Sequence, residues 1–175
     1  MELILTVLIV TQSFAISLGV GASTLAVLNF FAAIADGTIE DTERRMMGVV
    51  YTVLRIAMGA ILLSTLTRIV ITEPDLLALS GYTSATLIVV AALYGNAILM
   101  TKHLIPTTIG PALQAGSWYT LGVLSAIAPL GYTQYPLWCY LLGYAAVFLL
   151  AVAVINGAMA WMKRRADRPS QPEEV

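Results

Sequence analysis

LILTVLIVTQSFAISLGVGASTLAVLNFFAAIA, residues 3–35, contains no charged side chain. As a helix that rises about 1.5 Å per residue, this stretch would be roughly 50 Å long, whereas the hydrocarbon core of a bilayer is about 30 Å thick. The run therefore predicts a membrane-spanning helix that tilts, kinks or projects beyond the lipid. Gly19 and Gly21 mark the natural place for a kink.

The rest of the chain has the same character. Of its 175 residues, 59% are hydrophobic and 11% are charged, against about 45–50% and about 25% in soluble domains. A chain of this length and composition has room for four to six membrane crossings with short loops. The start of the chain lacks a basic region ahead of the apolar run, so we interpret it as a mature membrane segment rather than a signal peptide.

Charge and cysteine content exclude several classes of function. The formal net charge of -1 comes without the concentrated basic face that nucleic-acid binding requires. Cys139 is the sole cysteine, so an intramolecular disulfide and a cysteine-based metal site within one chain are excluded.

Charged residues, prolines and glycines divide the remaining sequence into four further apolar segments. We predict these at residues 46–71, 84–102, 111–128 and 136–162, in a single domain that covers residues 1–162. The polar tail KRRADRPSQPEEV, residues 163–175, is predicted to be short and disordered. The expected fold class is an all-α transmembrane helical bundle with five spanning helices.

The positions of lysine and arginine predict the orientation of this bundle. The tail after the fifth segment is basic, and Arg44, Arg45 and Lys102 occupy the first and third loops. The second and fourth loops contain neither residue type. Since loops rich in lysine and arginine stay in the cytoplasm, the pattern places the amino terminus outside and the carboxyl terminus inside.

Arg55 is the candidate functional residue of the second segment. It follows Arg44 by about 16 Å of helix, and we expect it near the bilayer midplane, where an arginine costs about 2.5 kcal/mol or more. We therefore expect a buried guanidinium that faces the bundle, with Gly59 leaving space for a neighbouring helix. The spanning segments contain no acidic partner, so the expected acceptors are backbone carbonyls, water, a bound anion or the amides of Asn29, Asn96 and Asn156. A structural strut and a ligand or ion path are the two alternatives.

Arg68 lies near the outer end of the same segment. It is 13 residues from Arg55, a rotation of about 220°, so the two occupy different faces of the helix. We expect Arg68 to reach towards the membrane surface and to pair with Glu73 or Asp75.

His103 is the only histidine of the chain. It shares a helical face with Asn96 and Met100 and follows Lys102 at the inner boundary. An interfacial histidine is favoured. A haem held by two histidines of one chain is excluded, whereas a His and Met pair, or a haem shared by a dimer, is an alternative.

Other patterns indicate packing rather than chemistry. Small residues recur at every fourth position as Ala15, Gly19 and Ser23, and again as Ala153 and Gly157, which is typical of helices in close contact. No catalytic triad, HExxH motif or phosphate-binding loop is present in the sequence. We therefore expect neither an enzyme nor a metal site, and we predict no cofactor.

The sequence also contains strings that point to a family. The stretch GVGASTLAVLNFFAAIADGTIEDTERRM at residues 19–46, the stretch NAILMTKHLIP at residues 96–106 and the triplet Ser117, Trp118 and Tyr119 resemble a family of small uncharacterised bacterial multi-pass inner-membrane proteins. The resemblance covers roughly Gly19 to Ile127. It implies the architecture and a bacterial cytoplasmic membrane, and it implies no activity.

The chain departs from the pattern of that family at two positions. Val27 stands where the family has an aspartate in the first helix, and Arg55 stands near a family aromatic. A function of that aspartate would be lost or altered here.

Three functions compete at this point. The first is a transport or channel-type protein, oligomeric, with Arg55 and the asparagines along a polar path. The second is an accessory or scaffold subunit that packs against other membrane proteins. The third and weakest is a haem or quinone redox module, suggested by Met100 and His103. In each case the lipid bilayer is the surrounding partner, with further copies or other membrane proteins beside it.

Overall fold

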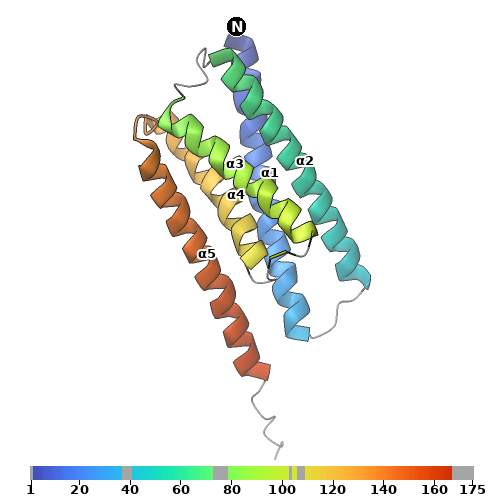
Figure 1. Cartoon of the computed structure of the whole chain (residues 1–175). Coiled ribbons are helices and arrows are strands. Elements are labelled where there is room, and N and C mark those ends of the chain that lie inside the picture. Colours follow the sequence, from blue (N-terminus) through green and yellow to red (C-terminus); the bar gives the residue numbers. More distant parts are fainter. Residues whose placement is uncertain (1, 37–40, 73–78, 103, 106–108, 167–175) are drawn as a thin grey trace, which may run out of the picture.

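The computed structural model describes residues 2–36, 41–72, 79–102, 104–105 and 109–166. Its elements are α1 (Glu2–Asp36), α2 (Asp41–Thr72), α3 (Gly81–Thr101), α4 (Ile109–Ile127), the 3-10 helix η1 (Ala128–Leu130) and α5 (Leu137–Ala166). Successive α-helices run antiparallel, so the first turn of α1 and the last turn of α5 lie at opposite ends of the bundle (Figure 1). The predicted all-α fold is confirmed.

Four of these helices have the length and composition of membrane spans. The qualifying stretches are Glu2–Asn29, Asp41–Thr72, Gly81–Thr101 and Leu137–Met162. The remaining helix, α4, packs against α1, α3 and α5, and its interior face includes Ser117 and Thr120. Their hydroxyls donate to backbone carbonyls one turn earlier, so α4 carries polar groups inside the bundle that lower its hydropathy.

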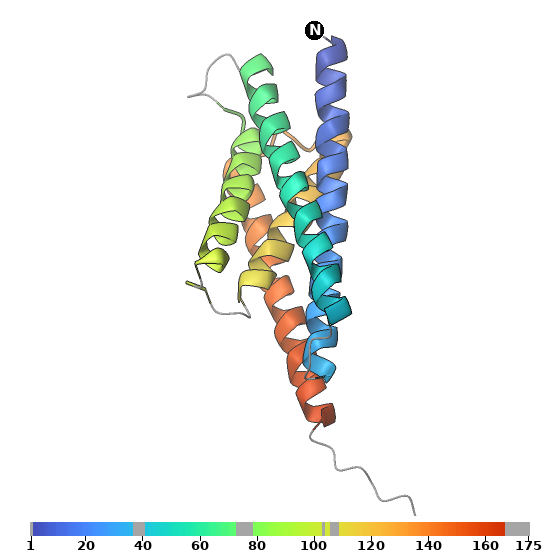
Figure 2. The same cartoon turned by 90° about the vertical axis from the view of Figure 1, so that its right-hand side faces the viewer.

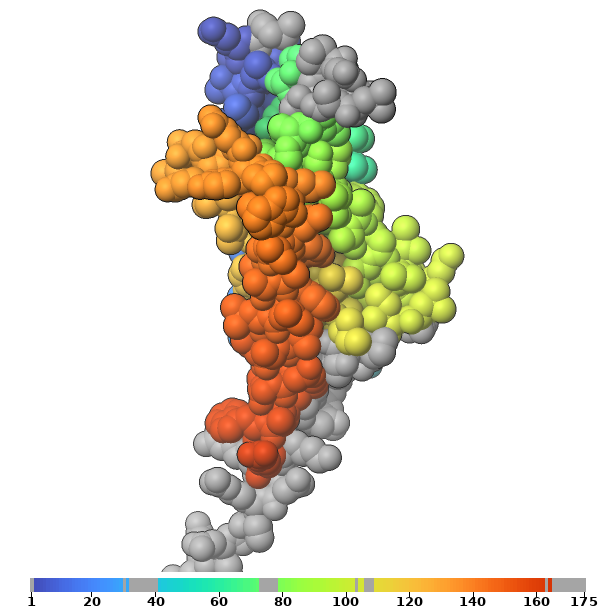
Figure 3. All heavy atoms as spheres, turned by 60° about the vertical axis from the view of Figure 1, so that its left-hand side comes forward, coloured from blue at the N-terminus to red at the C-terminus, as the bar shows by residue number. Residues whose placement is uncertain are grey.

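The helices differ in length and therefore project unequally. α1 is a continuous helix of 35 residues through both glycines, which corresponds to about 52 Å. It packs along α2, and the two extend beyond α3 at the end that carries the amino terminus (Figure 2). At the other end α5 continues past α3 and α4 to Ala166 (Figure 1). Figure 3 shows α5, in orange and red, along one face of the bundle.

Local sequence signals explain where several helices begin and end. Ser80 caps α3, because its side-chain oxygen accepts a hydrogen bond from the backbone N–H of Thr83 at 3.1 Å. Pro111 lies in the first turn of α4, where a proline needs no backbone donor. Gly131 ends η1 with a φ of 84°, a left-handed conformation that glycine adopts without steric strain.

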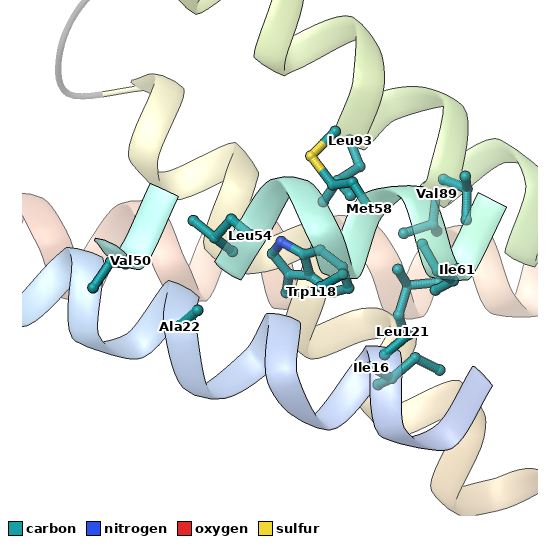
Figure 4. Close-up of a cluster of buried hydrophobic side chains, with 13 residues drawn as sticks. Ile16, Ala22, Val50, Leu54, Met58, Ile61, Val89, Leu93, Trp118 and Leu121 are labelled. Carbon is teal, nitrogen blue, oxygen red and sulfur yellow. The ribbon is translucent and has the colours of Figure 1, made fainter. Parts of the chain in front are cut away.

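The core lies where α1, α2, α3 and α4 meet. Trp118 of α4 is fully buried there, among apolar side chains of α1, α2 and α3 (Figure 4). Gly19 of α1 makes this arrangement possible, because a Cβ atom at that position would lie 2.2 Å from two atoms of the Trp118 ring.

The two predicted seams of small residues have different surroundings. Ala15, Gly19 and Ser23 are all buried, so the predicted close packing of the first helix is confirmed. Ala153 and Gly157 of α5 are exposed. The second seam therefore faces outward from the chain.

Candidate functional site

Arg55 has a different environment from the one expected. It is exposed in the chain, and its guanidinium forms no hydrogen bond or ion pair within the part of the chain that the structure describes. It lies beside a groove of about 320 Å³ that α1, α2, α3 and α4 enclose. The expectation of a buried, hydrogen-bonded Arg55 is thus wrong for the single chain.

The depth of Arg55 explains this exposure. Thr101, the last residue of α3, lines the same groove, so Arg55 lies towards the end of the bundle where α3 stops. α2 begins at Asp41, and its first turns extend beyond the end of α3 (Figure 2). A guanidinium near one end of a bundle can reach the membrane surface with its long side chain.

The three predicted asparagines do not gather around Arg55. Asn29 is half-buried on α1, Asn156 is exposed on α5, and neither lines the groove. Asn96 alone is buried, at 1% exposure. None of the three candidate amides is therefore an acceptor for Arg55 among the described contacts, and water or a bound anion stays the alternative.

Asn96 instead joins α3 to α4. Its Nδ2 atom donates to the backbone carbonyl of Gly110 at 3.0 Å and to Oε1 of Gln114 at 3.0 Å, and it lies 3.5 Å from the sulfur of Met100. Gln114 and Met100 both line the groove. Asn96 thus contacts Gln114 and Met100, two residues of the groove wall, and forms no hydrogen bond with Arg55.

Arg68, further along α2, turns into the bundle. It lines a cavity of about 350 Å³ at the opposite end, together with side chains of α1, α3, α4 and η1. Its Nε and Nη2 atoms are buried and have no hydrogen-bond partner among the described residues. A buried donor without a partner costs about 1–3 kcal/mol, and more when the group is charged. These two donor atoms are thus buried, whereas the predicted partners Glu73 and Asp75 lie outside the described residues, so the predicted pairing stays a prediction.

The cavity at Arg68 is called the outer cavity and the groove at Arg55 the inner groove, after the orientation that the sequence predicts. The wall of the outer cavity contains both polar and apolar side chains. Polar side chains from three helices reach it, namely Gln12, Ser13, Tyr82, Thr86 and Ser125. Several already donate within the protein: Gln12 donates to Thr65 at 3.4 Å, Tyr82 to the Leu124 carbonyl at 3.1 Å, and Thr86 to the Tyr82 carbonyl at 3.0 Å. No aspartate or glutamate is among the described residues that line the cavity. The cavity therefore has one positive charge without a negative counterpart on its described wall.

The outer cavity and the inner groove are arranged on the same four helices. Along α1 the lining runs from Ile16 of the outer cavity to Ser23 of the groove, and along α4 it runs from Leu121 to Gln114. Each interval is seven residues, or about 10 Å of helix. Gly19 and Trp118 fall within these intervals. The core layer around Trp118 thus separates two hollow spaces.

The described residues show no arrangement of side chains that supports the redox hypothesis. His103 lies outside the described residues, and Met100 lines the inner groove. Within the described ranges, no three His, Cys, Asp or Glu side chains come together as metal ligands.

Sequence reasoning missed the outer cavity. Its polar residues come from α1, α3 and α4 and are dispersed over more than a hundred positions, so no local motif marks them. One signal was present, since Gln12 and Ser13 are polar residues inside the long uncharged first segment.

The comparisons with known proteins identify no relative of this chain. No protein-family model matches the chain, and no curated protein or solved structure matches it significantly. Functional inference therefore rests on the chain's own geometry.

Proposed function

We propose that this chain is a transport or channel-type protein of a bacterial inner membrane, with five crossings, the amino terminus outside and the carboxyl terminus inside. Its path for an ion or small solute runs between α1, α2, α3 and α4. The inner-membrane assignment is supported by the resemblance of residues 19–127 to small bacterial membrane proteins and by the basic loops that favour this orientation.

The observation that carries the proposal is the pair of hollow spaces on one set of helices. The outer cavity contains Arg68 and the inner groove contains Arg55, so α2 supplies an arginine to each. Charged residues within membrane-spanning helices usually face the bundle interior or a water-filled cavity and mark pathways for substrates or ions. A short packed layer around Trp118, about 10 Å thick by helix rise, lies between the two spaces.

Such an arrangement is that of a closed path. A solute in the outer cavity has to pass the Trp118 layer to reach Arg55, so this layer would have to rearrange during transport. Arg55 then receives the solute near the inner surface, where the guanidinium is accessible.

Flux measurements in liposomes test this function. Purified protein is reconstituted, and the flux of K⁺, chloride and small carboxylates is followed with the wild type, Arg55→Leu and Asn156→Leu. We expect flux of at least one of these solutes, a reduction of about tenfold in Arg55→Leu, and no change in Asn156→Leu, whose side chain is exposed on α5. Equal flux in the wild type and Arg55→Leu contradicts the path, as does the absence of flux for every solute.

A scaffold function is the second candidate, and α5 favours it. Ala153 and Gly157 form a seam suited to close helix packing, yet both are exposed in the chain. A second copy of the chain, or another membrane protein, would cover this seam. Cross-linking in liposomes tests it: the wild type is expected to form a defined oligomer that Gly157→Leu abolishes, and a wild-type chain that remains monomeric removes the support.

A further inference from the structure

The outer cavity has the chemistry of a binding site. Arg68 has two buried donor atoms, Nε and Nη2, that have no partner among the described residues. These two atoms lie on one edge of the planar guanidinium and are spaced to match the two oxygens of a carboxylate. Because both atoms are buried, an oxyanion in the cavity that Arg68 lines would reach them when the guanidinium turns towards the cavity.

The charge of the described wall points in the same direction. Arg68 is the only charged residue among the described residues that line the cavity, and Ser13 and Ser125 bring two further hydroxyls to it. Gln12, Tyr82 and Thr86 are held by their hydrogen bonds to other protein groups. A cation would meet Arg68 at short range and be repelled, whereas an anion would satisfy its donors.

Size and apolar lining narrow the class of anion. The cavity measures about 350 Å³, at the lower end of the range of about 300–1,000 Å³ for small-molecule sites. Ile9, Leu121, Leu124 and Pro129 supply apolar wall. Such a wall suits a short hydrocarbon tail better than it suits inorganic phosphate, which has polar oxygens on every side.

We infer that the outer cavity binds a small organic carboxylate, with the carboxylate on Nε and Nη2 of Arg68 and the hydrocarbon part against the apolar wall. As a statement about the transported substrate, this inference rests on the proposed transport function. The binding step itself can be measured without any flux.

Binding to the full-length chain in detergent provides the first test. Acetate, butyrate, inorganic phosphate and the neutral analogue butyramide are titrated while the thermal unfolding of the protein is monitored. We expect butyrate to stabilise the wild type at lower concentration than acetate or phosphate, and butyramide to have no effect. Stabilisation by butyramide equal to that by butyrate, or by none of the anions, overturns the inference. Preference for phosphate over butyrate overturns the assignment to an organic carboxylate.

Variants of the chain test whether Arg68 is the residue that binds the carboxylate. Arg68→Gln is expected to weaken the apparent butyrate affinity at least tenfold, and Arg68→Lys to restore part of it. Arg45→Gln is the matched control and should leave the affinity unchanged, because Arg45 is exposed on the same helix and lines neither hollow space. If Arg68→Gln does not fold, Ser125→Leu serves instead, because it fills the cavity while Arg68 stays in place. Wild-type affinity in the folded Arg68 or Ser125 variant, or an equal loss in Arg45→Gln, contradicts the site.

Flux measurements in liposomes distinguish the proposed carboxylate site from the proposed transport function. Binding that depends on Arg68, together with an absence of butyrate flux in liposomes, supports the site and contradicts its role in transport. Flux that is unchanged in Arg68→Gln supports transport and contradicts the cavity as the substrate site.

Discussion

Gly19 and Trp118 show how one small residue determines the centre of this bundle. The indole lies so close to the α1 backbone that a Cβ atom at position 19 would stand 2.2 Å from ring carbons. Trp118 is at the same time fully buried among side chains of three other helices, so the ring has little room to move away. The small residue at position 19 therefore sets the distance between α1 and α4.

Gly19→Ala is accordingly expected to destabilise the fold. Overpacking of a filled core costs about 1–3 kcal/mol, which exceeds the gain of about 0.5–1 kcal/mol that alanine brings to a helix interior. Gly21→Ala is the matched control, since a Cβ atom there meets nothing within 4 Å, and it is expected to be neutral or stabilising. Thermal unfolding in detergent measures both. Similar melting temperatures for the two variants would contradict the proposed role of Gly19.

Arg55 and Arg68, both on α2, show which part of a site can be predicted from sequence. Their position on one helix and on different faces follows from 13 residues of spacing, and the structure places them at separate hollow spaces. The sequence predicted a buried Arg55 and a surface-reaching Arg68, whereas Arg55 is exposed and two donor atoms of Arg68 are buried. The side chain of an arginine is long enough to turn inward or outward, so neighbouring helices decide its direction.

At the scale of helices, the limits of prediction have a similar cause. Charged and breaking residues delimit the segments, so the presence of each helix was predictable from the sequence. It was harder to predict which face of a helix packs against its neighbours. α1 is apolar on nearly every side, so the periodicity of its sequence marks no buried stripe. Small residues carried the signal instead, as Ala15, Gly19 and Ser23 do. In α4, buried serine and threonine positions indicate an interior location only once the neighbouring helices are known.

The contact between α3 and α4 depends on Asn96. Its amide binds the Gly110 carbonyl and Gln114 across the two helices, and Asn96→Leu would leave both partners without this donor. We expect the free energy of unfolding to fall by about 1–3 kcal/mol. Asn156→Leu is the control, with a change within about 0.5 kcal/mol, because Asn156 is exposed on α5. Unfolding in graded denaturant compares the two, and equal stabilities would show that the Asn96 bonds contribute nothing.

At the scale of the whole molecule, the distribution of lysine and arginine agrees with the alternating direction of the helices. The helices alternate in direction along the bundle (Figure 1). Apart from Arg55 and Arg68, the lysines and arginines of the sequence follow the first, third and fifth apolar segments. The turn before α5 is thus at the opposite end of that helix from Arg164. Since lysine and arginine near helix ends are retained in the cytoplasm, this turn should face outward.

Labelling with a membrane-impermeant maleimide tests that orientation. Cys139 is the only native cysteine, so Cys139→Ala gives a background in which Gln134→Cys and Ser170→Cys are introduced separately. Gln134 is exposed in the turn before α5, and Gln134→Cys is expected to react in intact cells. Ser170→Cys, in the carboxyl-terminal tail, should react only after the membrane is permeabilised. Reaction of both in intact cells would mean that α5 does not cross, whereas the reverse pattern would keep the crossing and invert the orientation, placing the Arg68 cavity on the cytoplasmic side.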